Sequence, residues 1–134
     1  MRSHESTQSQ SGTYVLVIVD DFSRFTWTIF LKSKNDTFTE FAALMKKTQR
    51  KLDLKLISIR SDHGTEFENS EFLGYCKENG ISHNFSAPRT SRQNGVVERK
   101  NSTLEEMTRT MLISSSLSQR FWAEALSTAC YILN

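Results

Sequence analysis

An unbroken apolar run near the start of the chain limits the possible folds more than any other feature. The run Thr13–Val19 contains three valines and an isoleucine, and β-branched residues of this kind favour β-strands. Polar residues do not alternate along it, so we expect a strand that is buried on both faces. Such a strand needs a covering layer on each side of its sheet, which indicates an α/β fold.

The rest of the chain supplies further strands and the covering helices. Turn residues at Asp20–Ser23 and a second strand at Arg24–Lys32 predict a hairpin. The elements expected after it are a helix to about Leu52, a strand at 55–61, a short helix at 68–79, a strand at 81–86, a long helix at 95–114 and a last helix that carries Phe121 and Trp122. This order predicts a mixed sheet flanked by helices.

Length and composition indicate one globular domain. The chain has 134 residues, of which 37% are hydrophobic and 24% charged, and we expect a mobile polar tail at 1–12 and a domain at 13–134. No apolar run approaches the roughly 18 residues of a membrane span, so we expect no membrane partner. The first residues lack the apolar region of a signal peptide, so we expect an intracellular protein. Cys76 and Cys130 are too few for a disulfide framework or a zinc module.

Two acidic residues with 35 residues between them, Asp62 and Glu98, are the candidate site. Asp62 ends an apolar strand run and precedes a His63-Gly64 turn, whereas Glu98 lies near the start of the long helix. A strand end and a helix start can bring two carboxylates together above the edge of a sheet. Carboxylates are hard-oxygen ligands for Mg²⁺ or Mn²⁺, and two such metals can clamp an in-line phosphoryl displacement.

Each of these acidic residues also has a simpler interpretation. An aspartate before His-Gly commonly closes a turn with its own side chain, and a glutamate at a helix start is favoured by the helix dipole alone. Asp20 and Asp21 fit a turn as well, with Asp20 as an alternative metal ligand. Both interpretations stay open for each residue at this stage.

Four stretches resemble the integrase catalytic core of copia-type retrotransposons, and the resemblance runs from about Gly12 to Asn134. It implies an RNase H-like fold and a DDE transferase. Such enzymes trim DNA 3′ ends with water and then use the 3′-OH to attack target DNA. The stretches that carry the resemblance are Tyr14–Trp27, Ile59–Phe67, Ser86–Asn101 and, near the end, Phe121–Ala125 with Ala129–Asn134.

Site residues follow from the resemblance position by position. Asp62 matches the second metal-binding aspartate of the family, Glu98 its glutamate, and Asn94 a loop position that meets the donor DNA end. Basic residues next to this site favour phosphate contact, although a mixed solvated face is the alternative. These basic residues are Arg89, Arg92, Arg99 and Lys100.

The resemblance also implies partners, a cofactor and a defect. It implies two Mg²⁺ or Mn²⁺ ions, DNA partners (element ends and target DNA), a possible homo-oligomer, and a nuclear location for the integration step. The first aspartate of the family would precede Met1, so we expect this chain to lack that ligand, and to lack the first central strand that carries it. An inactive integrase core is the resulting hypothesis. The alternative is a non-catalytic nucleic-acid-binding or interaction relic of a decayed element.

Overall fold

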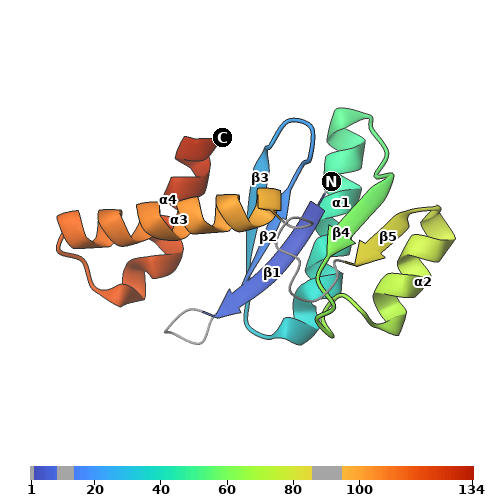
Figure 1. The fold of residues 1–134 in the computed structure, drawn as a ribbon, viewed down its shortest axis with the longest axis horizontal. Helices are drawn as coiled ribbons and strands as arrows, with labels where there is room; N and C mark the ends of the chain where they lie inside the picture. Colours follow the sequence, from blue (N-terminus) through green and yellow to red (C-terminus); the bar gives the residue numbers. More distant parts are fainter. Residues whose placement is uncertain (1, 9–13, 86–94) are drawn as a thin grey trace.

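A computed structural model of the protein describes residues 2–8, 14–85 and 95–134, and Figure 1 shows the arrangement of the elements. Strands lie in the middle, with α3 and α4 on one side and α1 and α2 on the other. The elements in chain order are β1 (Arg2–Gln8), β2 (Tyr14–Val19), β3 (Thr26–Leu31), η1 (Lys34–Asp36), α1 (Thr37–Leu52), β4 (Ser58–Ser61), α2 (Ser70–Asn79), β5 (Ser82–Phe85), α3 (Gly95–Ser114), η3 (Gln119–Phe121) and α4 (Trp122–Leu133).

The described strands form two sheets. β1, β2 and β3 make an antiparallel sheet in that order, and β4 pairs with β5 in parallel. β1 also runs close to β4, with Cα atoms within 8 Å. The antiparallel hairpin and the parallel β4–α2–β5 unit together confirm the expected mixed α/β architecture.

Alternate side chains of β2 belong to two different cores, which confirms that this strand is buried on both faces. Leu16 and Ile18 pack in the core formed with α1 and α2, whereas Val15, Val17 and Val19 pack in the core formed with α3 and α4. The side chains of a strand point alternately to opposite faces, so one apolar run serves both layers.

The first residues of the chain differ from the expectation. Residues 2–8 were expected in a mobile tail, but they form β1 and pair with β2 from Arg2 opposite Val19 to Gln8 opposite Tyr14. β1 therefore lies beside β2 and close to β4. The segment is polar and without period, and its strand conformation comes from backbone pairing, which a side-chain pattern does not reveal.

Specific caps fix the helix between the two parallel strands. The side chain of Asn69 accepts a hydrogen bond from the backbone N–H of Phe72 at 3.0 Å, so α2 begins at Ser70. Gly80 ends the helix with a left-handed φ of 67°, a conformation that glycine adopts without a steric penalty. These two caps set where β5 starts, and hence which of its residues lie opposite β4.

None of the helices in the described part of the chain is both long and apolar enough to cross a bilayer. The longest, α3, is polar along its outer face.

Candidate metal and nucleic-acid site

Asp62 directly follows the last residue of β4 and is half-buried. The backbone N–H of Gly64 donates a hydrogen bond to its Oδ1 atom at 2.8 Å. This contact is the side-chain turn that the simpler interpretation predicted. It engages one oxygen of the carboxylate and holds the side chain in a defined orientation at the end of the strand.

Glu98 lies in the first turn of α3 and is half-buried. Its neighbour Val97 is fully buried in the same core as Val15, Val17 and Val19 of β2. The packing of Val97 therefore anchors the start of α3 against the sheet. A carboxylate there is stabilised by the positive end of the helix dipole.

The turn after Asp62 brings a second carboxylate near the first. A Cβ atom added to Gly64 would lie 2.9 Å from Asp62 Oδ1 and 2.7 Å from Glu66 Oε2. A side chain at this position would require one or both of these carboxylates to move. The sequence analysis did not single out Glu66, and the signal that it missed was the acidic residue two positions after a turn glycine.

A hydrogen-bonded pair supports β4 just before Asp62. The Oγ atom of Ser61, which is fully buried, lies 2.8 Å from Nε2 of His83 on β5. Burial lowers the pKa of His83 below its ordinary value, so the ring is neutral near neutral pH. The sequence analysis missed this pair, because a contact between two strands depends on their register.

His63, the residue after Asp62, is exposed and already has partners. Its Nδ1 atom lies 2.9 Å from Glu68 Oε2, and its ring stacks on Phe85 with centroids 5.1 Å apart. These contacts fit a turn histidine that links the turn to the segment before α2 and to β5.

The donor atoms suit a divalent metal, but the described residues do not complete a site. Asp62 and Glu98 offer carboxylate oxygens, the ligand type that Mg²⁺ and Mn²⁺ prefer. Among the side chains that the structure describes in 14–85 and 95–134, no three of His, Cys, Asp or Glu are grouped so that they could hold a metal ion. Asp62 and Glu98 each offer a carboxylate, and a full metal site needs further ligands.

The predicted DNA-binding residues divide into two groups. Arg99 is exposed and Lys100 half-buried, both in the first turns of α3 beside Glu98. Arg89, Arg92 and Asn94 lie outside the described residues. The roles of all five, and those of Asp62 and Glu98, stay predictions.

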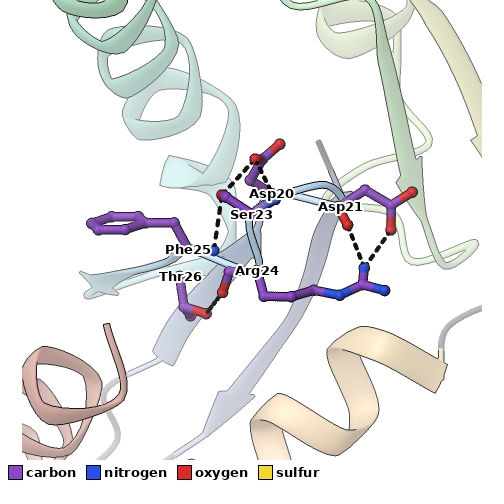
Figure 2. Close-up of polar contacts among 6 residues, drawn as sticks. All are labelled: Asp20, Asp21, Ser23, Arg24, Phe25 and Thr26. Carbon is purple, nitrogen blue, oxygen red and sulfur yellow. Dashed lines mark hydrogen bonds and ion pairs between the residues drawn. The ribbon is translucent and has the colours of Figure 1, made fainter.

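Asp20 is part of the β2–β3 turn, as Figure 2 shows. Its Oδ2 atom accepts hydrogen bonds from the hydroxyl of Ser23 at 2.6 Å and from the Ser23 backbone N–H at 3.1 Å. The hydroxyl contact is the main reason why the pKa of Asp20 lies below its ordinary value. Arg24 closes the same turn by donating to the carboxylate of Asp21 at 2.9 Å.

Asp20 lines an apolar groove of about 800 Å³ together with residues 56–58, which lead into the start of β4. Asp62 follows the other end of β4, about 13 Å from Ser58 at roughly 3.3 Å per residue. The turn contacts of the Asp20 carboxylate fit the simpler interpretation, and its role as a metal ligand stays a prediction.

The class of protein follows from this arrangement. Antiparallel and parallel strands between two helical layers, with acidic residues after β4 and at the start of α3, fit the RNase H-like arrangement of integrase catalytic cores. The integrase core domain family matches residues 5–91, and the chain belongs to that family.

The relatives to which this integrase core domain is similar are Pol polyproteins of transposons. It is 40% identical over 128 residues to the Retrovirus-related Pol polyprotein from transposon TNT 1-94 of Nicotiana tabacum, covering 95% of this chain and 10% of that protein. It is 36% identical over 124 residues to that from transposon RE2 of Arabidopsis thaliana, covering 90% of this chain and 8% of that protein. The chain thus spans about a tenth of the length of these relatives.

Solved structures agree on the fold. The chain in the simian T-cell lymphotropic virus intasome, in complex with PP2A regulatory subunit B56 gamma, matches with a TM-score of 0.73 and 22% identity, over 99% of this chain and 48% of that one. The HTLV-2 integrase catalytic core domain in complex with magnesium matches with a TM-score of 0.68 and 22% identity, over 99% of this chain and 84% of that one. The expected RNase H-like fold is confirmed.

Proposed function

We propose that this chain supplies the catalytic-core portion of an integrase that processes DNA 3′ ends and joins them to target DNA. One observation carries the proposal: in a member of the integrase core domain family, Asp62 lies in a constrained turn at the end of β4, and Glu98 lies at the start of a helix that packs on β2. Transfer of a phosphoryl group between oxygen atoms depends on positioning and charge neutralisation, which such residues provide.

Asp62 and Glu98 are the residues that would hold a divalent cation, Mg²⁺ or Mn²⁺, in the two-metal arrangement typical of this chemistry. The related HTLV-2 catalytic core was solved in complex with magnesium, which supports the assignment. When bound, such cations lower the pKa of an attacking water or hydroxyl and offset the charge on the leaving oxygen. The Gly64 N–H contributes by fixing one oxygen of Asp62.

Basic residues near Glu98 would place the DNA. Arg99 and Lys100 follow Glu98 on α3, so phosphates that they bind would pass close to the proposed metal ligands. Arg89, Arg92 and Asn94 precede the same helix in sequence and are proposed to extend this contact. We propose element ends and target DNA as partners, a homo-oligomer as the acting form, and the nucleus as the place of integration.

The 134 residues by themselves are proposed to be inactive or nearly so in strand transfer. Among the side chains that the structure describes, no three acidic, histidine or cysteine residues are grouped as metal ligands. The loss of one carboxylate ligand removes much of the cation affinity on which the reaction depends. The same observation favours a second candidate function, a nucleic-acid-binding relic without turnover.

Mn²⁺ binding and DNA binding by the 134-residue chain test these proposals together. We expect Asp62→Asn and Glu98→Gln each to weaken Mn²⁺ binding by about tenfold or more, because each removes a ligand charge. Asp36→Asn and Glu106→Gln are matched controls. Asp36 is exposed and makes no side-chain cap at α1, and Glu106 is exposed on α3.

Three outcomes separate the candidates. Weaker Mn²⁺ binding in both site variants, with both controls unchanged, supports the integrase site. Salt-dependent binding of a short DNA duplex without any effect of the site variants on Mn²⁺ supports the relic. Efficient Mg²⁺-dependent strand transfer by the isolated chain would refute the proposed inactivity.

A further inference from the structure

We propose that His83 is a positioning residue for Asp62 and acts through the hydroxyl of Ser61. The inference rests on the proposed function of Asp62 as a metal ligand and adds a residue from a different strand to that site. His83 contacts neither metal nor DNA in this scheme. It fixes the backbone at the end of β4, directly before the residue that carries the carboxylate.

The contacts run from β5 to the carbonyl of Asp62. Ser61 Oγ lies 2.8 Å from His83 Nε2 and donates a hydrogen bond to the backbone oxygen of Asp62 at 3.1 Å. Ser61 is fully buried, so this hydroxyl has no solvent exposure. The ring of His83 packs against Phe85 and Phe72, with centroids 4.2 and 5.9 Å away.

The Ser61 hydroxyl has a single proton, and this proton determines which groups donate and which accept in the series of hydrogen bonds. Because Ser61 gives its proton to the carbonyl of Asp62, the Nε2–H of His83 must be the donor to Ser61 Oγ. The Nδ1 atom then carries no proton and faces the sulfur of Cys76 at 4.0 Å, where a thiol can donate weakly. Burial lowers the pKa of His83 and raises that of Cys76, and both changes favour the neutral forms that these hydrogen bonds require.

Asp62 is thereby held at two points. Ser61 fixes its carbonyl, and the Gly64 N–H fixes Oδ1 of its carboxylate at 2.8 Å. His83 pairs with Ile59 in the strand register but reaches the hydroxyl of Ser61, two residues further along β4. The contact therefore links the end of β4 to β5 through side chains as well as through the backbone ladder.

A purely structural role would satisfy two buried polar groups without any effect on Asp62. The two roles differ in what a conservative variant does. His83→Gln keeps an N–H donor near the position of Nε2, whereas His83→Leu removes every polar atom. Ser61→Ala is a smaller change that removes the same hydrogen bonds. It keeps the positioning role testable if the His83→Leu variant fails to fold.

The experiment measures Mn²⁺ affinity and hydrogen exchange of the Gly64 amide in the 134-residue chain. We expect His83→Leu and Ser61→Ala to weaken Mn²⁺ binding by about tenfold and to speed exchange at Gly64. We expect His83→Gln to remain within about threefold of the original affinity. Thr37→Val is the control, because it removes another fully buried hydroxyl, on α1, which donates to the carbonyl of Lys34 at 2.7 Å.

The outcomes distinguish this inference from the proposed function. If Asp62→Asn weakens Mn²⁺ binding but His83→Leu and Ser61→Ala do not, the positioning role is overturned and the metal site stands. Equal losses in His83→Gln and His83→Leu, or a loss in Thr37→Val, also overturn it. If Asp62→Asn has no effect on Mn²⁺ while Gly64 exchange still responds to His83, the proposed metal site fails and the positioning of the Asp62 turn by His83 is supported.

Discussion

Replacing Gly64 by alanine tests whether the turn after β4 depends on the close approach of two carboxylates. The added Cβ would lie 2.9 Å from Asp62 Oδ1 and 2.7 Å from Glu66 Oε2, whereas ordinary contacts begin near 3.4 Å. Gly64 has no left-handed φ, so alanine meets no backbone penalty there. The effect must come from these two contacts.

The expected loss of stability follows from the hydrogen bond at this turn. Oδ1 of Asp62 must retreat by about 0.5 Å, which stretches its 2.8 Å bond from the Gly64 N–H beyond the usual 3.2 Å limit. A hydrogen bond to a charged group contributes about 1.5–3 kcal/mol. Alanine recovers roughly 0.4–1 kcal/mol by restricting the unfolded chain. We therefore expect Gly64→Ala to lower the free energy of unfolding by about 1 kcal/mol.

Urea unfolding followed by circular dichroism measures this change, and a Mn²⁺ titration measures its effect on the proposed site. Gly74→Ala is the matched control, because the Cβ there has nothing within 4 Å and alanine stabilises an exposed helix position by up to about 1 kcal/mol. Repeating Gly64→Ala in a Glu66→Ala background removes the second contact. A Gly64→Ala chain as stable as the original, with unchanged Mn²⁺ affinity, would refute the reasoning.

Three further predictions concern other parts of the chain. Gly80→Ala should lower the free energy of unfolding by about 1–2 kcal/mol, because φ is 67° at this cap. Gly74→Ala, on α2 itself, should have the opposite sign, and urea unfolding of both variants measures the difference. Ser23→Ala should raise the pKa of Asp20 towards its ordinary value, since the Ser23 hydroxyl is the main cause of the lowered value, and an NMR titration of the carboxylate would detect no change if the contact were absent. Burial lowers the pKa of His83 below that of the unfolded chain, so the unfolded state takes up the proton first. The free energy of unfolding should therefore be highest above about pH 6.5 and fall as the pH drops towards the pKa of the folded state. The free energy of unfolding of His83→Gln should lack this dependence on pH.

Local sequence predicts the elements of this fold wherever side chains alone decide the structure. The run that became β2 is apolar on both faces, and the long helix begins at Gly95 and ends at Ser114 as its apolar stripe predicts. β1 could not be predicted, because Arg2–Gln8 has no apolar period and is a strand only through its pairing with β2. The caps of α2 were partly visible in the sequence, since Gly80 signals a helix end.

The site was predictable as residue types but not as contacts. An aspartate after a strand and a glutamate at a helix start can be found in the sequence, and the structure places Asp62 and Glu98 on those elements. The Ser61–His83 hydrogen bond depends on the register of β4 against β5, where Ile59 lies opposite His83. A one-residue change of that register would turn the histidine to the other face of the sheet, and no local pattern fixes it.

Strand position explains why two aspartates with similar local sequences have different surroundings. Asp20 and Asp62 both follow apolar strands and precede turns, so their local sequences are nearly equivalent. Asp20, which follows β2, lines one groove with residues 56–58, at the start of β4. Asp20 therefore lies towards the start of β4, whereas Asp62 follows its end. Only the residue after β4 lies at the edge where the parallel strand β5 also ends, and only there can His83 support it through Ser61.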